Sequence, residues 1–265
     1  MFIVLEGIDG CGKTTQARLL YEWFMNEKYN VFLTAEPTDN RIGKFIKEIL
    51  SSEEILSPET LSLLFSADRY EHIKQEIEPA LKDNKIVISE RYYYSTIAYQ
   101  SAQGVDMKWL KEINSFAMKM KPDLAIFLDI RPELATPKIR EKDRKFREIM
   151  EKSYKKYRDA QRHYLNNRKA LYGKLAEKKT IRELEDSYKR FLNAEEEYER
   201  ERSKYLKFEK FEKPTTLEAN TENYERFLSR VRENYLHFDD IMRIDGSKPV
   251  ELVFDDIKRA LLKFL

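Results

Sequence analysis

The feature that most constrains the fold is the segment GIDGCGKT near the start of this 265-residue chain. It places the phosphate-loop pattern G-x-x-x-x-G-K-[ST] on Gly7, Gly12, Lys13 and Thr14, directly after the apolar run FIVLE and before a helical pattern. In this context the loop backbone and the helix N-terminus surround a phosphate, Lys13 reaches the β- and γ-oxygens, and the Thr14 hydroxyl ligates Mg²⁺. The sequence therefore predicts a nucleoside triphosphate site. Its expected contacts are Gly7, Gly10, Cys11, Gly12, Lys13, Thr14 and Thr15.

Asp9 is unexpected in a loop that binds anions. A carboxylate about 6 Å from a phosphate charge would be opposed by about 3 kcal/mol at an effective dielectric constant of 20. We therefore expect Asp9 to point away from the donor phosphates. There it would accept hydrogen bonds from a second substrate that carries hydroxyl groups.

The pattern of the chain changes near residue 140. Before that point, short apolar runs alternate with helical patterns, which is typical of a parallel sheet with helices on both faces. Residues 141–213 consist mainly of Lys, Arg, Glu and Tyr, and a globular pattern resumes at residue 214. We predict one α/β domain, formed by residues 1–140 and 214–265, that is interrupted by a helical insertion at 141–213.

The sequence of the predicted insertion indicates two helices with heptad-like apolar spacing. They are joined near a T-x-x-E capping box at Thr180 and Glu183. This indicates an antiparallel helical hairpin, similar to a coiled coil. Residues 141–179 carry 14 basic and 6 acidic side chains, whereas residues 180–213 carry 9 and 10. The basic arm has three open interpretations: an extended lid, a nucleic-acid surface, or a solvated face paired with its neighbour. The expected seam positions are Phe146, Met150, Tyr154, Tyr157, Gln161, Tyr164, Arg168, Leu171 and Leu175, then Ile181, Leu184, Tyr188, Phe191, Glu195, Tyr198, Arg202 and Tyr205.

Composition narrows the class of protein further. A hydrophobic content of 42% is enough for a sizeable core, and 49 basic against 47 acidic side chains leave a net charge of +2, which indicates no particular partner. The single cysteine, Cys11, excludes a disulfide framework. No basic segment precedes the first apolar run, and no apolar run reaches the roughly 18 residues that span a bilayer. We expect a cytoplasmic protein without membrane contacts.

Three further segments supply candidates for a second substrate. LLFSADRYEH places Phe65 and Arg69 four residues apart on one helical face, which suits a planar base. SERYYYSTIAYQ follows a predicted strand and offers Arg91 as a bidentate phosphate ligand. AEPTDNRIGK offers Glu36 and Arg41. Taken singly, Phe65 also fits a core residue, Arg91 a partner of a surface carboxylate, and Arg41 a solvated side chain.

Taken together, these segments resemble the thymidylate kinases of the nucleoside monophosphate kinase group. The resemblance covers about residues 1–140 and 221–265. It rests on FIVLEGIDGCGKTTQA, EPTDNRIGK, LLFSADRYEH, IEPALKDNKIVISERYYYSTIAYQ, PDLAIFLDIRPELA, YERFLSRVRENY and IDGSKPVE. It implies transfer of the γ-phosphoryl group of ATP to dTMP, a five-stranded parallel sheet, and often a homodimer.

The resemblance also implies roles for individual residues. Asp9 would receive the sugar 3′-hydroxyl, Arg91 the acceptor phosphate, and Tyr99 would crowd the sugar 2′ position. Phe65 would stack on thymine, and Arg69 would donate a hydrogen bond to it. The remaining predicted substrate contacts are Glu36, Arg41, Ser95, Gln100 and Gln103.

Two departures from the family pattern concern catalysis. Glu90 stands where the family carries Asp before the arginine. The extra methylene keeps the charge and would shift any contact to a Mg²⁺ site at Thr14 and Glu90, which is compatible with reduced activity but does not indicate inactivation. The phosphate loop also lacks the arginine that some members carry there, and members of this kind supply the cation from the lid. The lid offers Lys138, Arg140, Arg144 and Arg147, and the predicted catalytic residues are Lys13, Glu90, Arg91, Arg140 and Arg144.

Other functions stay open at this point. Residues 84–87 read NKIV and lack the aspartate of the guanine motif N-K-x-D, which disfavours switch GTPases. A kinase for another deoxynucleoside monophosphate has the same signature. A second hypothesis, from the class of binding proteins, is a nucleotide-binding scaffold whose hairpin engages a partner. A nucleic-acid partner for the basic arm is disfavoured.

Overall fold

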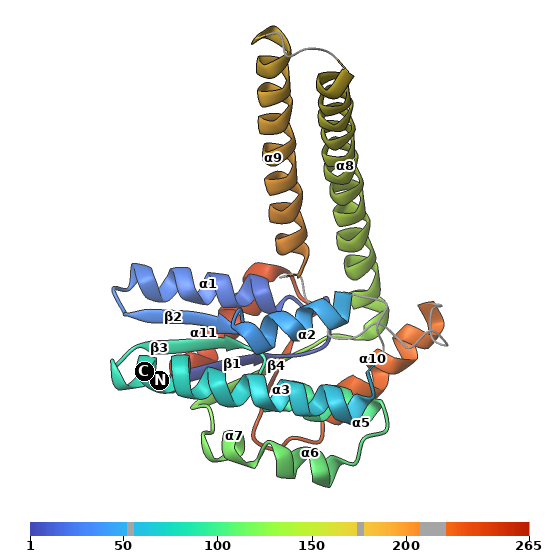
Figure 1. Ribbon diagram of the computed structural model, residues 1–265. Helices are drawn as coiled ribbons and strands as arrows, with labels where there is room; N and C mark the ends of the chain where they lie inside the picture. The colour runs from blue at the N-terminus through green and yellow to red at the C-terminus, as the bar shows by residue number, and fades with distance from the viewer. Residues whose placement is uncertain (52–55, 174–177, 207–220, 265) are drawn as a thin grey trace. The chain divides into compact units, whose positions relative to one another are not determined.

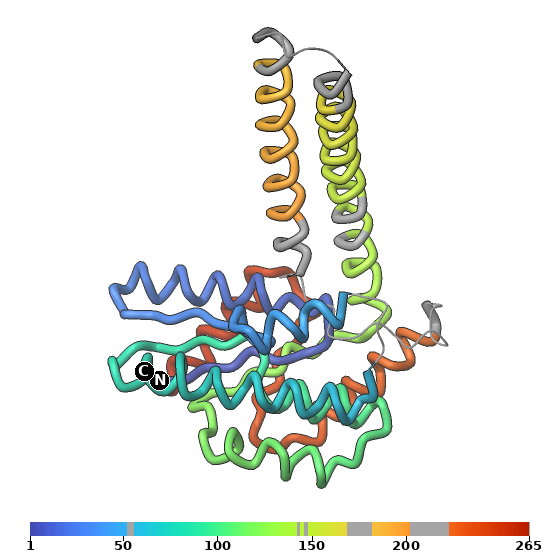
Figure 2. Tube along the Cα trace, viewed as in Figure 1, coloured from blue at the N-terminus to red at the C-terminus, as the bar shows by residue number. Residues whose placement is uncertain are grey.

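The computed structural model of the protein describes residues 1–51, 56–173, 178–206 and 221–264, and Figure 2 traces them along the chain. The chain divides into two compact units. The first, here called the core unit, comprises Met1–Ile139 and Lys210–Leu265. The second, here called the hairpin unit, comprises Arg140–Glu209. Each unit is described by itself.

The core unit contains a five-stranded parallel sheet with the strand order β2-β3-β1-β4-β5. The strands are β1 (Phe2–Glu6), β2 (Val31–Ala35), β3 (Ile86–Glu90), β4 (Leu124–Asp129) and β5 (Met242–Asp245). Strand β1 pairs on both sides, so that Leu5 lies opposite Glu90 of β3 and Ile126 of β4. Because β1 is central, all five of its residues are buried. The predicted α/β fold with a five-stranded parallel sheet is confirmed.

Helices cover both faces of this sheet (Figure 1). Helix α1 (Lys13–Asn26) contacts α11 (Val250–Leu261), whereas α5 (Tyr93–Ala102) contacts both α3 (Pro58–His72) and α10 (Thr221–Tyr235). Helix α3 begins where Pro58 follows the cap residue Ser57, whose hydroxyl accepts the Thr60 N–H at 3.2 Å. The remaining helices of the core unit are α2 (Arg41–Ser51), the π-helical turn η1 (Ile73–Ile77), α4 (Glu78–Lys82), α6 (Met107–Ile113) and α7 (Ser115–Lys119).

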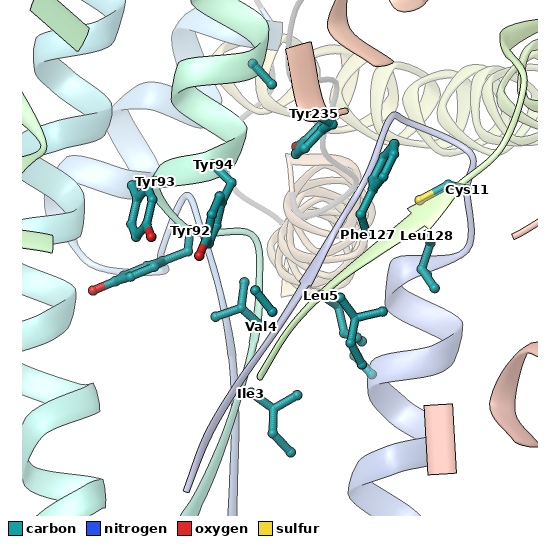
Figure 3. Packing of buried hydrophobic residues seen from close by; sticks show 14 of the residues in the cluster. Ile3, Val4, Leu5, Cys11, Tyr92, Tyr93, Tyr94, Phe127, Leu128 and Tyr235 are labelled. Carbon is teal, nitrogen blue, oxygen red and sulfur yellow. The ribbon is translucent and has the colours of Figure 1, made fainter. Parts of the chain in front are cut away.

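The centre of the core unit is built from apolar strands and a group of tyrosines (Figure 3). Phe127 of β4 stacks on Tyr235 of α10, with ring centroids 4.8 Å apart. Tyr92 meets Phe2 of β1 edge to face at 5.2 Å. Helix α10 follows the hairpin unit in the sequence, so the chain returns after the hairpin to complete the core that its first half began.

The hairpin unit contains α9 (Lys178–Leu206) and most of α8 (Pro132–Gly173). The two helices run antiparallel, because Tyr154 contacts Tyr198 at 5.7 Å while Tyr164 contacts Tyr188 at 5.2 Å between ring centroids. Helix α9 begins two residues before the predicted start at Thr180.

The contact between α8 and α9 includes part of the expected seam, since Tyr157 contacts Phe191 and Tyr198 at 5.7 and 5.6 Å between ring centroids. The buried side chains are Ser153, Ser187 and Ala194, which are 6%, 2% and 4% exposed, whereas the expected seam residues Tyr154 and Tyr188 are 48% and 44% exposed. Small side chains are buried beside these ring pairs, and Tyr154 and Tyr188 lie at the exposed edge of the contact. The expected positions Phe146, Leu171, Leu175, Ile181, Arg202 and Tyr205 lie outside the described side chains, and residues 207–213 of the expected insertion lie outside the described residues. Among the described residues, every helix is too short or too polar to cross a membrane.

Candidate active site

The phosphate loop connects β1 to α1 and is packed tightly against β4 and the start of α8. A side chain at Gly7 would place its Cβ 2.8 Å from the Leu128 carbonyl oxygen, and one at Gly10 would lie 2.8 Å from the Ala135 carbonyl oxygen. Both glycines also have positive φ angles, 144° and 77°. Only glycine fits these two positions, which explains the motif's glycine at Gly7 and shows that this loop also needs one at Gly10, a variable position of the motif.

Lys13 lies at the first position of α1 and is 6% exposed. Its ammonium group donates to the carbonyl oxygens of Gly7 and Ile8, at 2.9 and 3.0 Å. The positive charge is therefore held at the centre of the loop. This is the place where the sequence motif predicts contact with the β- and γ-phosphates.

Thr14 and Glu90, the two predicted metal ligands, meet at the carboxyl end of the sheet. The Thr14 hydroxyl donates to Glu90 Oε2 at 2.7 Å. Glu90 is the last residue of β3, the strand that pairs with β1 immediately before the loop. A hydroxyl beside a carboxylate is an all-oxygen donor set, which fits the hard-ligand preference of Mg²⁺.

Asp9 and Arg91 form a buried ion pair beside the loop. The Asp9 side chain retains slight exposure, and its backbone N–H donates to the Tyr99 hydroxyl at 3.0 Å. The carboxylate is thus turned toward a cation. The structure brings together three residues that the sequence assigned to the acceptor, and the opposing cation offsets the repulsion that made Asp9 unexpected.

Arg91 is fully buried and has a strained backbone. Its φ angle is 72°, a left-handed conformation that costs a non-glycine residue about 1–3 kcal/mol. Its guanidinium donates to Ser95 Oγ at 3.0 Å and lies 5.1 Å from the centre of the Tyr99 ring. Strain of this kind persists where the surroundings fix the residue, and it is concentrated at functional sites. The alternative that Arg91 pairs with a surface carboxylate does not fit its burial.

Glu6 is a site residue that the sequence reasoning missed. It is fully buried in β1 and accepts hydrogen bonds from the Tyr92 N–H at 2.7 Å, the Ser95 hydroxyl at 2.6 Å and the Tyr235 hydroxyl at 2.9 Å. Burial raises the pKa of Glu6, whereas these hydrogen bonds and the charge of Arg91 act in the opposite direction. The sequence feature that could have indicated Glu6 is a carboxylate within the otherwise apolar run FIVLE.

A second cluster surrounds Arg69, which is fully buried. Its Nε donates to Glu36 Oε2 at 2.8 Å, and its Nη2 donates to Thr96 Oγ1 at 3.0 Å. Its Nη1 donates to the side chain of Asn114. Glu36 also lies 3.0 Å from Nδ1 of His72, a buried residue that the sequence reasoning did not select. The structure therefore brings Glu36 and Arg69, two of the predicted substrate contacts, together as a buried ion pair.

The other predicted acceptor residues differ in burial. Phe65 of α3 is 1% exposed and belongs to the apolar core, which agrees with its alternative interpretation as a core residue. Gln100 of α5 is fully buried. Gln103 follows α5 and has a buried Oε1 with no hydrogen-bond partner in the part of the chain that the structure describes. Arg41, at the start of α2, is exposed.

Three of the four lid cations lie on the surface of their units. Lys138 is exposed in the core unit, and Arg140 and Arg144 are exposed in the hairpin unit. Arg144 lies 3.0 Å from Glu148 of the same helix. The side chain of Arg147 lies outside those that the structure describes.

A pocket of about 450 Å³ opens at the ends of β4 and β5. Asp129, the last residue of β4, accepts hydrogen bonds from Arg232 at 2.5 and 3.0 Å and from Arg243 at 2.6 Å. The other polar residues of the lining are Arg131, Asp245 and Ser247. The sequence reasoning missed this cluster because its members lie more than 100 residues apart in the chain, as the separations of 103 and 114 residues indicate.

Comparisons with known proteins all indicate the same family. The sequence profile of the thymidylate kinase family matches residues 5–188. A "probable thymidylate kinase" of Pyrococcus horikoshii is 55% identical over 134 residues, which span 49% of this chain and 64% of that protein. Proteins with the same name are 44% identical over 194 residues in Thermococcus kodakarensis and 40% identical over 197 residues in Methanococcus maripaludis. These two alignments span 70% and 73% of this chain, and 91% and 94% of the respective relative.

Proposed function

Because the chain belongs to the thymidylate kinase family, we propose that it transfers the γ-phosphoryl group of ATP to dTMP and releases dTDP and ADP. The observation that carries this proposal is the position of the Asp9–Arg91 pair directly beside the phosphate loop. A donor site and a cation for an acceptor phosphate thus share one edge of the sheet. The names of the relatives support the same activity.

On the donor side, the backbone of residues 10–15 would bind the phosphates and Lys13 would neutralise their charge. Thr14 and Glu90 would hold Mg²⁺, which when bound neutralises charge on the β- and γ-phosphates. The pocket at Asp129 would receive the base of the donor, because it lies at the carboxyl ends of β4, which pairs with β1 beside the loop, and of β5, and its arginines offer planar stacking surfaces.

On the acceptor side, Arg91 would bind the phosphate of dTMP, and Asp9 would orient the sugar through its 3′-hydroxyl. The Arg69 cluster would bind thymine together with Phe65, and the buried Oε1 of Gln103 supports this placement because a buried acceptor needs a donor. Tyr99 would exclude a 2′-hydroxyl, since its ring is buried against Arg91. Glu36, Arg41, Ser95 and Gln100 would complete the surroundings.

The reaction then needs no protein nucleophile. A phosphate oxygen of dTMP attacks the γ-phosphorus, and the bond to the bridging oxygen of ADP breaks. The protein contributes by holding the two nucleotides in line and by neutralising the charge on the transferred group. Arg140 and Arg144 are the proposed lid cations, in place of the arginine that the loop lacks.

A panel of nucleoside monophosphates tests this proposal. With ATP and Mg²⁺, release of ADP should be fastest with dTMP. Absence of turnover with dTMP, or faster turnover with CMP or AMP, would overturn the proposal. Faster turnover with a different deoxynucleoside monophosphate would retain the chemistry and change the substrate.

We further propose that residues 141–213 are an insertion in the lid, on the basis that the hairpin unit is compact by itself. Replacing them with a short Gly-Ser linker should lower kcat if the lid supplies the cation. Unchanged kcat would show that neither Arg144 nor the hairpin takes part in the transfer. The expected homodimer and the cytoplasmic location stay predictions, and a nucleic-acid partner for the basic arm stays disfavoured.

A further inference from the structure

We propose that Glu6 and Tyr235 are positioning residues that fix Arg91 and thereby the phosphate of the acceptor nucleotide. The proposal rests on the proposed role of Arg91. Neither residue belongs to the phosphate-loop pattern, and they come from opposite ends of the chain.

A continuous chain of hydrogen bonds connects these residues. Arg91 Nη1 donates to Ser95 Oγ at 3.0 Å, and the Ser95 hydroxyl donates to Glu6 Oε2 at 2.6 Å. The Tyr235 hydroxyl lies 2.9 Å from the same Glu6 oxygen and 2.8 Å from Ser95 Oγ. All four side chains are fully buried, so water cannot replace a missing partner at low cost.

The number of protons determines what each group does. Ser95 has one hydroxyl proton, and the short contact to Glu6 uses it, so the Ser95 lone pairs face Arg91. Without the carboxylate, this hydroxyl could rotate and direct its proton elsewhere. Burial raises the pKa of Tyr235 well above its ordinary value, so its hydroxyl stays a donor at neutral pH. Glu6 therefore sets the direction of Ser95, and Tyr235 holds the Glu6 carboxylate in place.

The two sides of the Arg91 guanidinium differ in access. Asp9 binds at Nη2 and is 9% exposed, whereas Ser95 binds at Nη1 and is fully buried. An acceptor phosphate would therefore approach from the Asp9 side, while the Glu6 side supports the guanidinium from behind. Such a support is needed because the left-handed backbone of Arg91 does not by itself favour this geometry.

The ring of Tyr235 gives this support a rigid attachment. It stacks on Phe127 of β4 at 4.8 Å and is fully buried, as Figure 3 illustrates. The ring is thus held by packing, and the hydroxyl can be removed without loss of that packing. This separation makes Tyr235→Phe an informative variant.

The experiment compares dTMP with thymidine, which lacks only the phosphate. Binding of both to wild type and Tyr235→Phe is measured by calorimetry. We expect the Kd for dTMP to rise about two- to tenfold, the range for one hydrogen bond, and the Kd for thymidine to change less than about twofold. An equal change for both ligands, or no change for either, would overturn the proposal.

Tyr94→Phe is the matched control, because Tyr94 is a buried tyrosine of the same helix as Ser95. Its ring stacks on Tyr93 at 4.1 Å and contacts Phe238. The hydrogen bonds that the structure gives to the Glu6 carboxylate come from Tyr92, Ser95 and Tyr235, and not from Tyr94. We expect unchanged binding of both ligands. Should Tyr235→Phe fold poorly, Ser95→Ala removes the direct bond to Arg91 and must show the same selective loss. In the double variant, the loss should be smaller than the sum of the two single losses, because both act on one contact.

Failure of this proposal can be told apart from failure of the proposed function. If wild type binds dTMP no more tightly than thymidine and has no dTMP kinase activity, the function itself is wrong. If wild type is active and Arg91→Lys weakens dTMP binding while Tyr235→Phe behaves as wild type, only the positioning role is wrong.

Discussion

The core unit and the hairpin unit are held together by different kinds of contact. In the core unit, Ile3, Val4 and Leu5 of the central strand are all 0% exposed, and large apolar side chains pack against them from both faces. In the hairpin unit, the described buried positions carry small residues, and the described aromatic rings are partly buried or, at Tyr154 and Tyr188, exposed. The core therefore gains its stability from buried apolar area, at about 25 cal/mol per Å². The hairpin depends on ring pairs and surface ion pairs, which are individually weak.

The largest expected difference between the two units is the loss of stability that a cavity in the core unit would cause. Leu5→Ala should lower the free energy of unfolding of the core unit by about 2–5 kcal/mol, because the site lies between two paired strands and cannot collapse. Denaturant unfolding of the core, followed together with hydrogen exchange of the α8 and α9 amides, measures this. Leu252→Ala is the control, since Leu252 is 52% exposed and should change stability by less than about 0.5 kcal/mol. A matching loss of protection in α8 and α9 under native conditions would show that the units are not energetically separate.

The next prediction concerns a substitution that should lower catalytic activity without changing the hairpin unit. Lys13→Ala should lower kcat by about a hundredfold or more, because the charge at the centre of the phosphate loop is lost. The exposed Lys108→Ala serves as the control and should retain wild-type kcat. The helical content of the hairpin unit should stay the same in both variants. A loss of less than about threefold would contradict the assignment of Lys13 to the transferred phosphate.

A smaller effect is expected within the hairpin. Phe191 contacts Tyr157 and Tyr164 at 5.7 and 5.8 Å, so Phe191→Ala should destabilise the hairpin unit by about 1–2 kcal/mol. Hydrogen exchange of α8 and α9 measures the change, and the Tm of the core unit should not move. Leu192→Ala, at a neighbouring position that is 41% exposed, is the control. Equal effects of the two substitutions would contradict the aromatic contacts as the source of hairpin stability.

The smallest effect is a difference in pH dependence. Burial raises the pKa of Glu6 above its ordinary value near 4.5, so the folded core loses stability as pH rises from there through the raised pKa. A hydrogen bond from Lys156 lowers the pKa of Glu197, so its contribution to the hairpin is present above pH 4.5 and is lost as pH falls through the lowered pKa. Stability profiles of Glu6→Gln and Glu197→Gln against wild type should therefore diverge with opposite sign. Parallel profiles would contradict this difference.

The hairpin also illustrates where sequence reasoning stops. Heptad-like spacing indicated two helices and their antiparallel pairing, because apolar periodicity follows from the local geometry of a helix. It could not select the rotation of each helix, since Ser153 and Tyr154 are neighbours and either can face the partner. Tertiary packing buried Ser153, which is 6% exposed, while Tyr154 reaches Tyr198 from a position that is 48% exposed.

For this protein, the sequence alone determined the phosphate loop, the parallel α/β sheet and most of the residues that gather around the loop. These depend on local patterns, namely glycine spacing, apolar runs and residue types that follow strands. Only the tertiary structure decided that Asp9 pairs with Arg91 across 82 residues, and that Glu6 meets Ser95 and Tyr235 across 89 and 229 residues. No local pattern encodes such partners, because a buried carboxylate requires donors that the fold delivers from distant segments of the chain.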